Sequence, residues 1–222
     1  MNTDDPAPTR NDLLNWSESL GAIARTGLGF TKSLYEQERF DEVLRVAAKI
    51  GAAATSDVGP EALYEEWKKE IGSGVDGYVT PKVVVGAVVG NDNGEVLLIQ
   101  RADSGIWLYP TGWADVGYSA SEVAEKEVRE ETGIICEVDS LLGIFDGARR
   151  GFHRIPLYSI VFFCRAVGGD LAGHPLEVTD VGWFGRDNLP EPLASADLWV
   201  DHAFDAINGN QPSVFFDEPR RD

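Results

Sequence analysis

The spacing of apolar residues predicts a helical region in the first third of the chain. Between residues 11 and 72, leucine, isoleucine, valine and alanine recur at helical spacing, and no strand pattern is present. Gly27 and Gly29 interrupt the first run, and Pro60 stands in the first turn of the third, where proline is favoured. The pattern therefore predicts a three-helix unit, with helices over 11–26, 33–53 and 60–71. The tryptophans on these helices and Trp199 are expected to pack between helices.

The pattern changes after a glycine-rich stretch around Gly72, Gly74 and Gly77, which predicts a linker. Beyond it, β-branched residues form runs typical of strands, and Asn91–Gly94 is a turn signal between the first two. We therefore predict an α+β fold, with an N-terminal helical domain over 1–76 and a second domain over 77–222. The expected strands are 83–89, 96–100, 134–138, 141–145, 155–167 and 176–184, and the expected helices are 119–132 and 196–207.

The helix predicted over 119–132 has signals at both ends. Ser119 and Glu122 have the spacing of a capping box, and Gly133 fits a left-handed cap after the last turn. Within the helix, Glu127, Glu130 and Glu131 are three and four positions apart, so their carboxylates share one face.

An acidic helix face is ordinarily a solvated surface, but this one crowds negative charge near the helix C-terminus. The helix dipole disfavours anions there. A hard divalent cation would offset that cost, because carboxylate oxygens suit Mg²⁺ or Mn²⁺. The face is therefore also a candidate metal site.

From Gly112 to Ile134 the sequence resembles the Nudix hydrolase signature, Gly-x5-Glu-x7-Arg-Glu-U-x-Glu-Glu-x-Gly-U, in which U is aliphatic. Tyr118 replaces the first Glu, and Lys126 replaces the Arg and keeps its charge without its fork geometry. The resemblance implies a metal site for Mg²⁺ or Mn²⁺ at Gly112 and the three glutamates, with a catalytic role for Lys126. The matching positions are Gly112, Glu127, Val128, Glu130, Glu131, Gly133 and Ile134.

The resemblance extends beyond the signature. Residues 96–110 look like the strand–loop–strand entry of a Nudix domain, and 176–184 resemble the later strand that supplies another acidic ligand or base. Asp180 holds that position by its distance from Trp183, with a turn or capping role as the alternative, and Glu177 is a second candidate. Residues 22–28 and 35–40 resemble the helical extension of a subgroup associated with CDP-choline and ADP-ribose hydrolysis. The implied fold is a Nudix-type mixed-sheet α/β/α sandwich with a small N-terminal helical domain.

Basic and aromatic residues are candidates for substrate binding. Arg101 ends a predicted strand, either as an exposed edge residue or as a phosphate contact. Tyr118 either contacts substrate or packs its loop. A basic cluster lies between two predicted strands and is either a solvated hairpin loop or a phosphate-binding lip; it comprises Arg149, Arg150, His153 and Arg154.

Charge narrows the classes of partner. The chain has 19 basic and 37 acidic residues, a formal net charge of −18, which opposes binding to nucleic acid or to anionic membranes. A small anionic substrate remains compatible, because a bound cation reverses the local field. No apolar run approaches the roughly 20 residues of a membrane span, and the opening residues carry no signal-peptide core. We therefore expect a cytoplasmic protein in which Cys136 and Cys164 are reduced core thiols.

Together these observations predict metal-dependent hydrolysis of a nucleoside diphosphate linked to a group X, giving a nucleoside monophosphate and phosphorylated X. Glu130, Glu177 or Asp180 would accept the proton of the attacking water. A non-catalytic nucleotide-sensing module would show a damaged glutamate triad, and an RNA-directed hydrolase is opposed by the net charge. The apolar stripes of the N-terminal helices must be buried against this chain or a second one, so we expect a homodimer.

Overall fold

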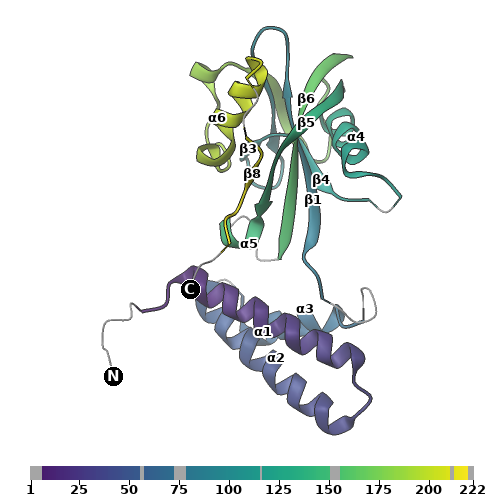
Figure 1. The fold of residues 1–222 in the computed structure, drawn as a ribbon, viewed down its shortest axis with the longest axis vertical. Coiled ribbons are helices and arrows are strands. Elements are labelled where there is room, and N and C mark those ends of the chain that lie inside the picture. Colours follow the sequence, from purple (N-terminus) through teal and green to yellow (C-terminus); the bar gives the residue numbers. More distant parts are fainter. Residues whose placement is uncertain are drawn as a thin grey trace. The chain divides into compact units, whose positions relative to one another are not determined.

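The computed structural model describes residues 7–55, 58–72, 79–115, 117–150, 156–210 and 213–219. The chain divides into two compact units, Met1–Lys82 with Gly147–Leu157, and Val83–Asp146 with Tyr158–Asp222. We call them the helical unit and the sheet unit (Figure 1). The predicted boundary between residues 76 and 77, with Gly74 and Gly77, falls outside the described residues.

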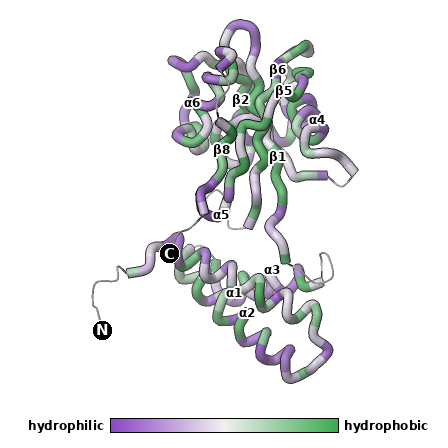
Figure 2. Tube along the Cα trace, in the orientation of Figure 1, coloured by the Kyte–Doolittle hydropathy of each residue, from purple (hydrophilic) through white to green (hydrophobic). Residues whose placement is uncertain are grey.

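The helical unit contains three long helices, α1 (Arg10–Phe30), α2 (Leu34–Thr55) and α3 (Pro60–Lys69). Thr9 caps α1 through a capping box with Asp12. The faces that these helices turn toward one another form an apolar core, and their outer faces are more polar (Figure 2). The core residues are Ala24, Leu44, Ala47, Ala48, Tyr64 and Trp67.

The first helix is longer than predicted, because Gly27 and Gly29 do not end it. The helix continues to Phe30, and the missing side chain of Gly27 leaves room for the Phe40 ring of α2, which a Cβ there would overlap. Glycine therefore serves close packing between two helices here, and the prediction of a break was wrong. The prediction that Trp16 packs between helices was also wrong, since half of its surface is exposed, whereas Trp67 and Trp199 are buried.

The sheet unit is built on one eight-stranded sheet with the order β3-β2-β1-β6-β5-β8, to which β4 is added on β1 and β7 on β2. β1 pairs antiparallel with β2 and β4, β2 with β3 and β7, and β5 with β6, whereas β5 and β8 run parallel, so the sheet is mixed, as predicted. The strands are β1 (Lys82–Gly90), β2 (Val96–Arg101), β3 (Trp107–Leu108), β4 (Thr111–Trp113), β5 (Ile134–Asp146), β6 (Leu157–Gly169), β7 (Val178–Phe184) and β8 (Phe215–Phe216).

Helices lie on both faces of this sheet, α4 (Ala120–Thr132) on one and α6 (Ala196–Ile207) on the other (Figure 1). Val123 and Val128 of α4 pack on Val85 and Leu97 of the central strands. On the other face, Trp199 of α6 meets the Tyr109 ring edge to face at 5.2 Å. The central strands β1 and β2 are strongly apolar (Figure 2), as expected for strands covered on both faces. The predicted α/β/α sandwich is confirmed.

One predicted pair of strands, 134–138 and 141–145, is in fact the single strand β5. The prediction leaves out Asp139 and Ser140, but pairing of β5 with β6 continues past them, with three register shifts along the pair. The short strand β3 lies within the strand–loop–strand expected over 96–110, whereas β4 and β8 were not predicted. The described residues also include two short helical elements, α5 (Gly147–Arg150) and a 3₁₀ turn (Arg186–Asn188). Within the described parts of the chain, no helix combines the length and apolarity that crossing a membrane requires.

Candidate functional site

Helix α4 presents the glutamates as the sequence predicts. The Ser119 hydroxyl accepts a hydrogen bond from the backbone N–H of Glu122, and the Glu122 carboxylate accepts one from the backbone N–H of Ser119. At the other end of the helix, Gly133 forms a left-handed cap with φ 73°. Because Val123 and Val128 are buried against the sheet, the helix turns Glu127 and Glu130 away from that core. The capping and burial pattern of this one helix therefore fixes the acidic face.

Glu131 is the most buried of the three glutamates, with 5% of its surface exposed. Its Oε2 accepts the backbone N–H of Thr111 at 2.9 Å, which ties α4 to β4. Burial raises the pKa of Glu131 to about 8, although the hydrogen bond from Thr111 opposes that rise. This carboxyl is held in place before any ligand arrives.

Glu127 packs directly against Gly112 of β4. A Cβ on Gly112 would overlap the Glu127 carboxylate, so any other residue at this position would displace it. Burial raises the pKa of Glu127, and the neighbouring Lys126 opposes that rise. The signature glycine thus acts here by lacking a side chain; its predicted membership of a metal site stays a prediction.

Lys126 lies among three carboxylates, and we call these four residues the Lys126 cluster. Its Nζ is 3.1 Å from Asp115 Oδ2, 3.1 Å from Glu130 Oε2 and 3.7 Å from Glu127 Oε1. The hydrogen bonds that Lys126 donates to Asp115 and Glu130 raise its pKa, so the ammonium is charged at neutral pH. The positive charge at the acidic face is supplied by the protein itself.

The donor set fits a divalent cation in its chemistry. Within the described ranges, no group of three or more His, Cys, Asp or Glu side chains stands close enough to hold an ion. Lys126 engages Glu130 and approaches Glu127, so two of the three glutamates already face a positive charge. Carboxylate oxygens remain the ligands that Mg²⁺ and Mn²⁺ prefer.

Arg101 and Glu177 reach the same region from the adjacent ends of β2 and β7. The N–H of Ala102 donates to the Glu177 carbonyl at 2.8 Å, which joins the two strand ends. The negative charge of Glu177 contributes to the raised pKa of Glu131, as Arg101 contributes in the opposite sense. The structure therefore brings these two predicted residues near the acidic helix.

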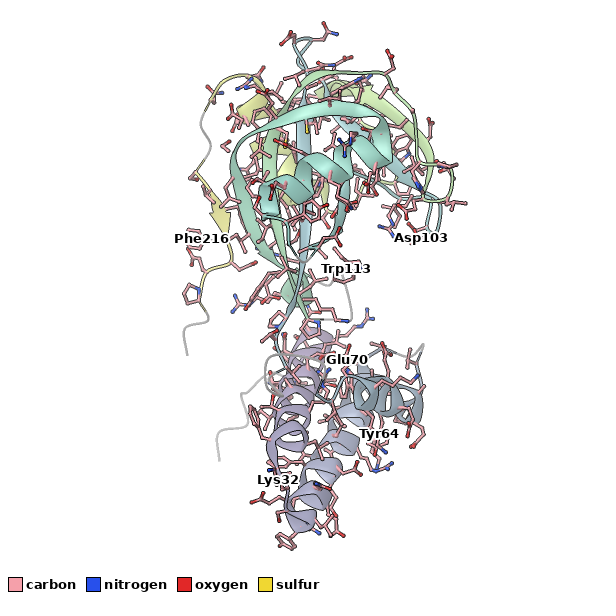
Figure 3. All side chains as sticks on the ribbon, turned by 90° about the vertical axis from the view of Figure 1, so that its right-hand side faces the viewer. Lys32, Tyr64, Glu70, Asp103, Trp113 and Phe216 are labelled. Atoms are coloured by element: carbon pink, nitrogen blue, oxygen red, sulfur yellow. The ribbon has the colours of Figure 1, made fainter. Side chains whose placement is uncertain are left out.

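Arg101 is engaged by Asp103 in a two-pronged ion pair. Its Nε and Nη2 donate to the two Asp103 oxygens at 2.9 and 2.6 Å, and Figure 3 labels Asp103. These hydrogen bonds raise the pKa of Arg101. Binding of a phosphate by Arg101 would require exchange of this partner.

The remaining predicted residues lie in more exposed or separate places. Asp180, opposite Gln100 on β7, accepts the N–H of Val181 at 2.8 Å, and Tyr118 is exposed. Arg149 and Arg150 belong to α5, which is part of the helical unit and forms a helical turn, not the predicted hairpin loop. His153 and Arg154, the other members of that basic cluster, fall outside the described residues.

Sequence reasoning missed Asp115 and His174. Asp115 lies three residues before Tyr118, the position where the signature has Glu, and that proximity was the available signal. The N–H of His174 donates to the Glu131 carbonyl at 3.1 Å, and its Nδ1 is 3.9 Å from Glu177 Oε2. In the part of the chain that the structure describes, this Nδ1 is buried without a hydrogen-bond partner. An isolated histidine in a loop gives no pattern from which a role could be predicted.

Two family models match the chain. Residues 80–204 match the NUDIX domain, and residues 11–65 match a domain described as UDP-X-like, N-terminal oligomerisation domain. Among curated proteins, the putative ADP-ribose pyrophosphatase YjhB of Bacillus subtilis is 28% identical over 208 residues, covering 92% of this chain and 96% of that protein. The ADP-ribose pyrophosphatase of Methanocaldococcus jannaschii is 33% identical over 117 residues, covering 51% of this chain and 68% of that protein.

Solved structures show the same similarity. A crystal structure of UDP-X diphosphatase has a TM-score of 0.54 and 26% identity, covering 93% of this chain and 99% of that one. An ADP-ribose pyrophosphatase from Streptococcus suis has a TM-score of 0.51 and 27% identity, covering 62% of this chain and 100% of that one. The first of these similarities spans the helical unit and the sheet unit alike.

Proposed function

The chain belongs to the NUDIX family, as a pyrophosphohydrolase with a helical N-terminal extension, and we propose that its substrate is a nucleoside diphosphate linked to a group X. The observation that carries this proposal is the intact glutamate face of α4, set against Gly112 of β4. The products are a nucleoside monophosphate and phosphorylated X. ADP-ribose is the first candidate, since relatives over most of the chain carry that substrate in their names, and CDP-choline is the second.

The proposed cofactor is Mg²⁺ or Mn²⁺, held by Glu127, Glu130 and Glu131. When bound, such a cation supplies neutralisation of the diphosphate charge. Glu131 is positioned for this by Thr111, and Glu127 by the open space at Gly112. Glu130 would supply the third carboxylate, and Lys126, whose Nζ is 3.1 Å from Glu130 Oε2, would add a positive charge beside it.

The chain's own residues supply binding and proton transfer. Arg101 would exchange Asp103 for a substrate phosphate, because both anions accept its two parallel N–H groups. Glu177 is the acceptor that we favour for the proton of the attacking water, at its carboxylate oxygen, because its backbone is hydrogen-bonded to Ala102, next to the proposed phosphate contact Arg101. Asp180 and Glu130 are the alternative acceptors.

The test is hydrolysis of a nucleotide panel by the full chain with Mg²⁺ or Mn²⁺, read by identification of the products. Glu130→Gln keeps side-chain size and removes a metal ligand, so turnover is expected to fall by at least about a hundredfold. Glu125→Gln is the matched control, since Glu125 is exposed on the same helix and a glutamine can still accept the Val138 N–H. Near-normal turnover of Glu130→Gln, or in excess chelator, would exclude this function.

The helical unit is proposed to form a homodimer. Trp16, Ile23 and Phe30 are exposed apolar residues spaced seven apart on α1, so they form one stripe along that helix. The match to a family described as an oligomerisation domain supports the same assignment. A second copy of this chain is the partner that would cover the stripe.

A charge placed in the stripe should separate the protomers. We expect Ile23→Glu to halve the mass measured by light scattering, because it places a carboxylate in an apolar interface. Val167→Glu, at an exposed valine of β6, should leave the mass unchanged. If Ile23→Glu still has the mass of a dimer, the dimer interface does not include the α1 stripe.

A cytoplasmic location is part of the proposal. Cys136 and Cys164 are both free and buried, which suits a reducing compartment. The net charge of −18 supports a small-molecule substrate over nucleic acid or a membrane surface.

A further inference from the structure

The chain departs from the Nudix signature at Tyr118 and Lys126, and both residues contact Asp115. Lys126 stands where the signature has Arg, and its Nζ is 3.1 Å from Asp115, in the loop that has Tyr118 where the signature has Glu. Asp115 Oδ2 makes this contact from 11 positions upstream, while Tyr118 is exposed and contributes no carboxylate. The loop thus supplies the negative charge three residues earlier than the signature does.

We propose that Asp115 is a positioning residue that acts through Lys126 to set the carboxylates of Glu127 and Glu130 for a divalent cation. The inference rests on the proposed function. It adds a residue that the signature does not contain, and it assigns a purpose to the loop between β4 and α4.

The geometry of lysine makes the extra anchor necessary. An arginine holds two carboxylates with a rigid planar fork, whereas an ammonium is a point charge on a flexible stem. Without Asp115, the remaining partners of Lys126 in the cluster would be Glu127 and Glu130, both of which are proposed metal ligands. With Asp115 on its other side, the ammonium keeps a partner when Glu130 turns to a cation.

The alternative is an ordinary surface ion pair, which contributes little to any property of the protein. Asp115 has 49% of its side chain exposed, so exposure alone does not separate the two readings. A matched pair exists on β5 and β6, where Asp139 Oδ1 is 3.0 Å from Arg165 Nε and Asp139 is 42% exposed. It has the same chemistry without contact to the Lys126 cluster, and it serves as the control.

The experiment measures binding of Mn²⁺ alone to the full-length protein, from the electron paramagnetic resonance signal of the free ion. Asp115→Asn removes the charge at constant size and should weaken Mn²⁺ binding by about tenfold, the effect typical of residues that orient metal ligands. Asp115→Glu restores the charge and should bind within about twofold of wild type, and so should the control Asp139→Asn. The exposure of Asp115 and an unchanged far-UV circular dichroism melt establish that the variants fold.

A variant without Lys126 tests whether Asp115 acts on the metal ligands through the Lys126 ammonium. In Lys126→Met, the further change Asp115→Asn should have no effect on Mn²⁺ affinity, because the proposed coupling passes through the ammonium. A tenfold loss that persists in this background would overturn the proposal, as would an Asp115→Asn affinity equal to that of wild type. Loss of affinity in Asp115→Glu as large as in Asp115→Asn would overturn it too.

The outcomes separate this inference from the proposed function. If the wild-type chain binds no Mn²⁺, the metal-dependent function fails. If the wild type binds Mn²⁺ and Asp115→Asn binds it equally well, only the role of Asp115 fails. A kinetic readout adds to this, since a positioning residue should lower kcat for the best substrate of the panel and leave KM within about twofold.

Discussion

A cation lies among carboxylates at Arg25 in the helical unit and at Lys126 in the sheet unit, and the two arrangements differ in burial. In the helical unit, Arg25 is 2% exposed, pairs with Glu70 and lies 3.6 Å from Glu18. Its guanidinium also stacks 5.2 Å from the centre of the Trp67 ring, and Figure 3 labels Glu70 at the end of α3. In the sheet unit, Lys126 is 25% exposed and shares its charge among Asp115, Glu127 and Glu130.

The difference shows what each cation is suited to do. Arg25 has a planar fork, an aromatic partner and a hydrogen bond to the Gly21 carbonyl at 3.2 Å, so its loss would take a buried cation away from Glu18 and Glu70. Lys126 has water on one side and three flexible partners, so it can exchange one carboxylate for another at small cost. A cation among carboxylates therefore stabilises the fold of the helical unit at Arg25, whereas at Lys126 in the sheet unit it can change partners.

The largest difference in stability between the two cation sites is expected at Arg25. Arg25→Ala should lower the free energy of unfolding by about 3–5 kcal/mol, because Glu18 and Glu70 lose a buried partner. Urea unfolding followed by far-UV circular dichroism measures this loss. Arg39→Ala removes an exposed pair with Glu42 and should cost less than about 1 kcal/mol. Equal costs for the two variants would mean that Arg25 is no more structural than a surface residue.

Glu18 gives the stability of the helical unit a dependence on pH. Burial raises the pKa of Glu18 to about 7 from its ordinary 4.5, and the Arg25 charge only partly opposes this. Between pH 4.5 and 7 the unfolded chain loses this proton while the folded chain keeps it. The folded state binds more protons in that range, so its stability falls as the pH rises.

The variant Glu18→Gln isolates this effect. Relative to the variant, wild type should lose about 3 kcal/mol of unfolding free energy between pH 4.5 and 7.5. Urea titrations of both proteins at several pH values measure the difference, and the other carboxyl groups cancel in the comparison. Parallel stability curves for wild type and Glu18→Gln would contradict burial as the dominant influence on this carboxyl.

The smallest expected change in stability is at Lys126. Lys126→Met removes the charge and keeps the aliphatic stem, so the free energy of unfolding should change by less than about 1 kcal/mol. Turnover should nevertheless fall by about tenfold or more, because Glu127 and Glu130 lose their positioning partner. Urea unfolding and the hydrolysis assay on one preparation give both numbers. A loss of stability as large as that of Arg25→Ala would remove the distinction between the two cations.

The features that the sequence predicted are those determined within one helix or one strand. Capping at Ser119 and Gly133, and the shared face of Glu127, Glu130 and Glu131, follow from helical spacing alone. Gly27 was misread because its neighbour in space is Phe40, on another helix. The prediction leaves out Asp139 between two strands, but pairing with β6 decides the matter.

The unpredicted parts of the site depend on contacts between segments. Asp115 precedes the helix by a loop, and only the fold shows that its carboxylate reaches Lys126. The engagement of Arg101 by Asp103 is similarly a property of the loop geometry after β2. Spacing rules describe regular elements, so they carry no information on which loop side chain turns back toward a helix.

Trp16 and Trp113 are exposed, so their fluorescence can report on their surroundings. Among the six tryptophans they are the exposed ones, and one lies in each unit, Trp16 on α1 and Trp113 beside Gly112 on β4. Figure 3 labels Trp113. Exposed indoles emit at longer wavelength and are reached by iodide or acrylamide, whereas buried ones are shielded. Replacing either residue with phenylalanine would therefore leave the other as the most exposed indole. Its quenching would report on the proposed dimer stripe where Trp16 remains and on the acidic helix where Trp113 remains, without any attached label.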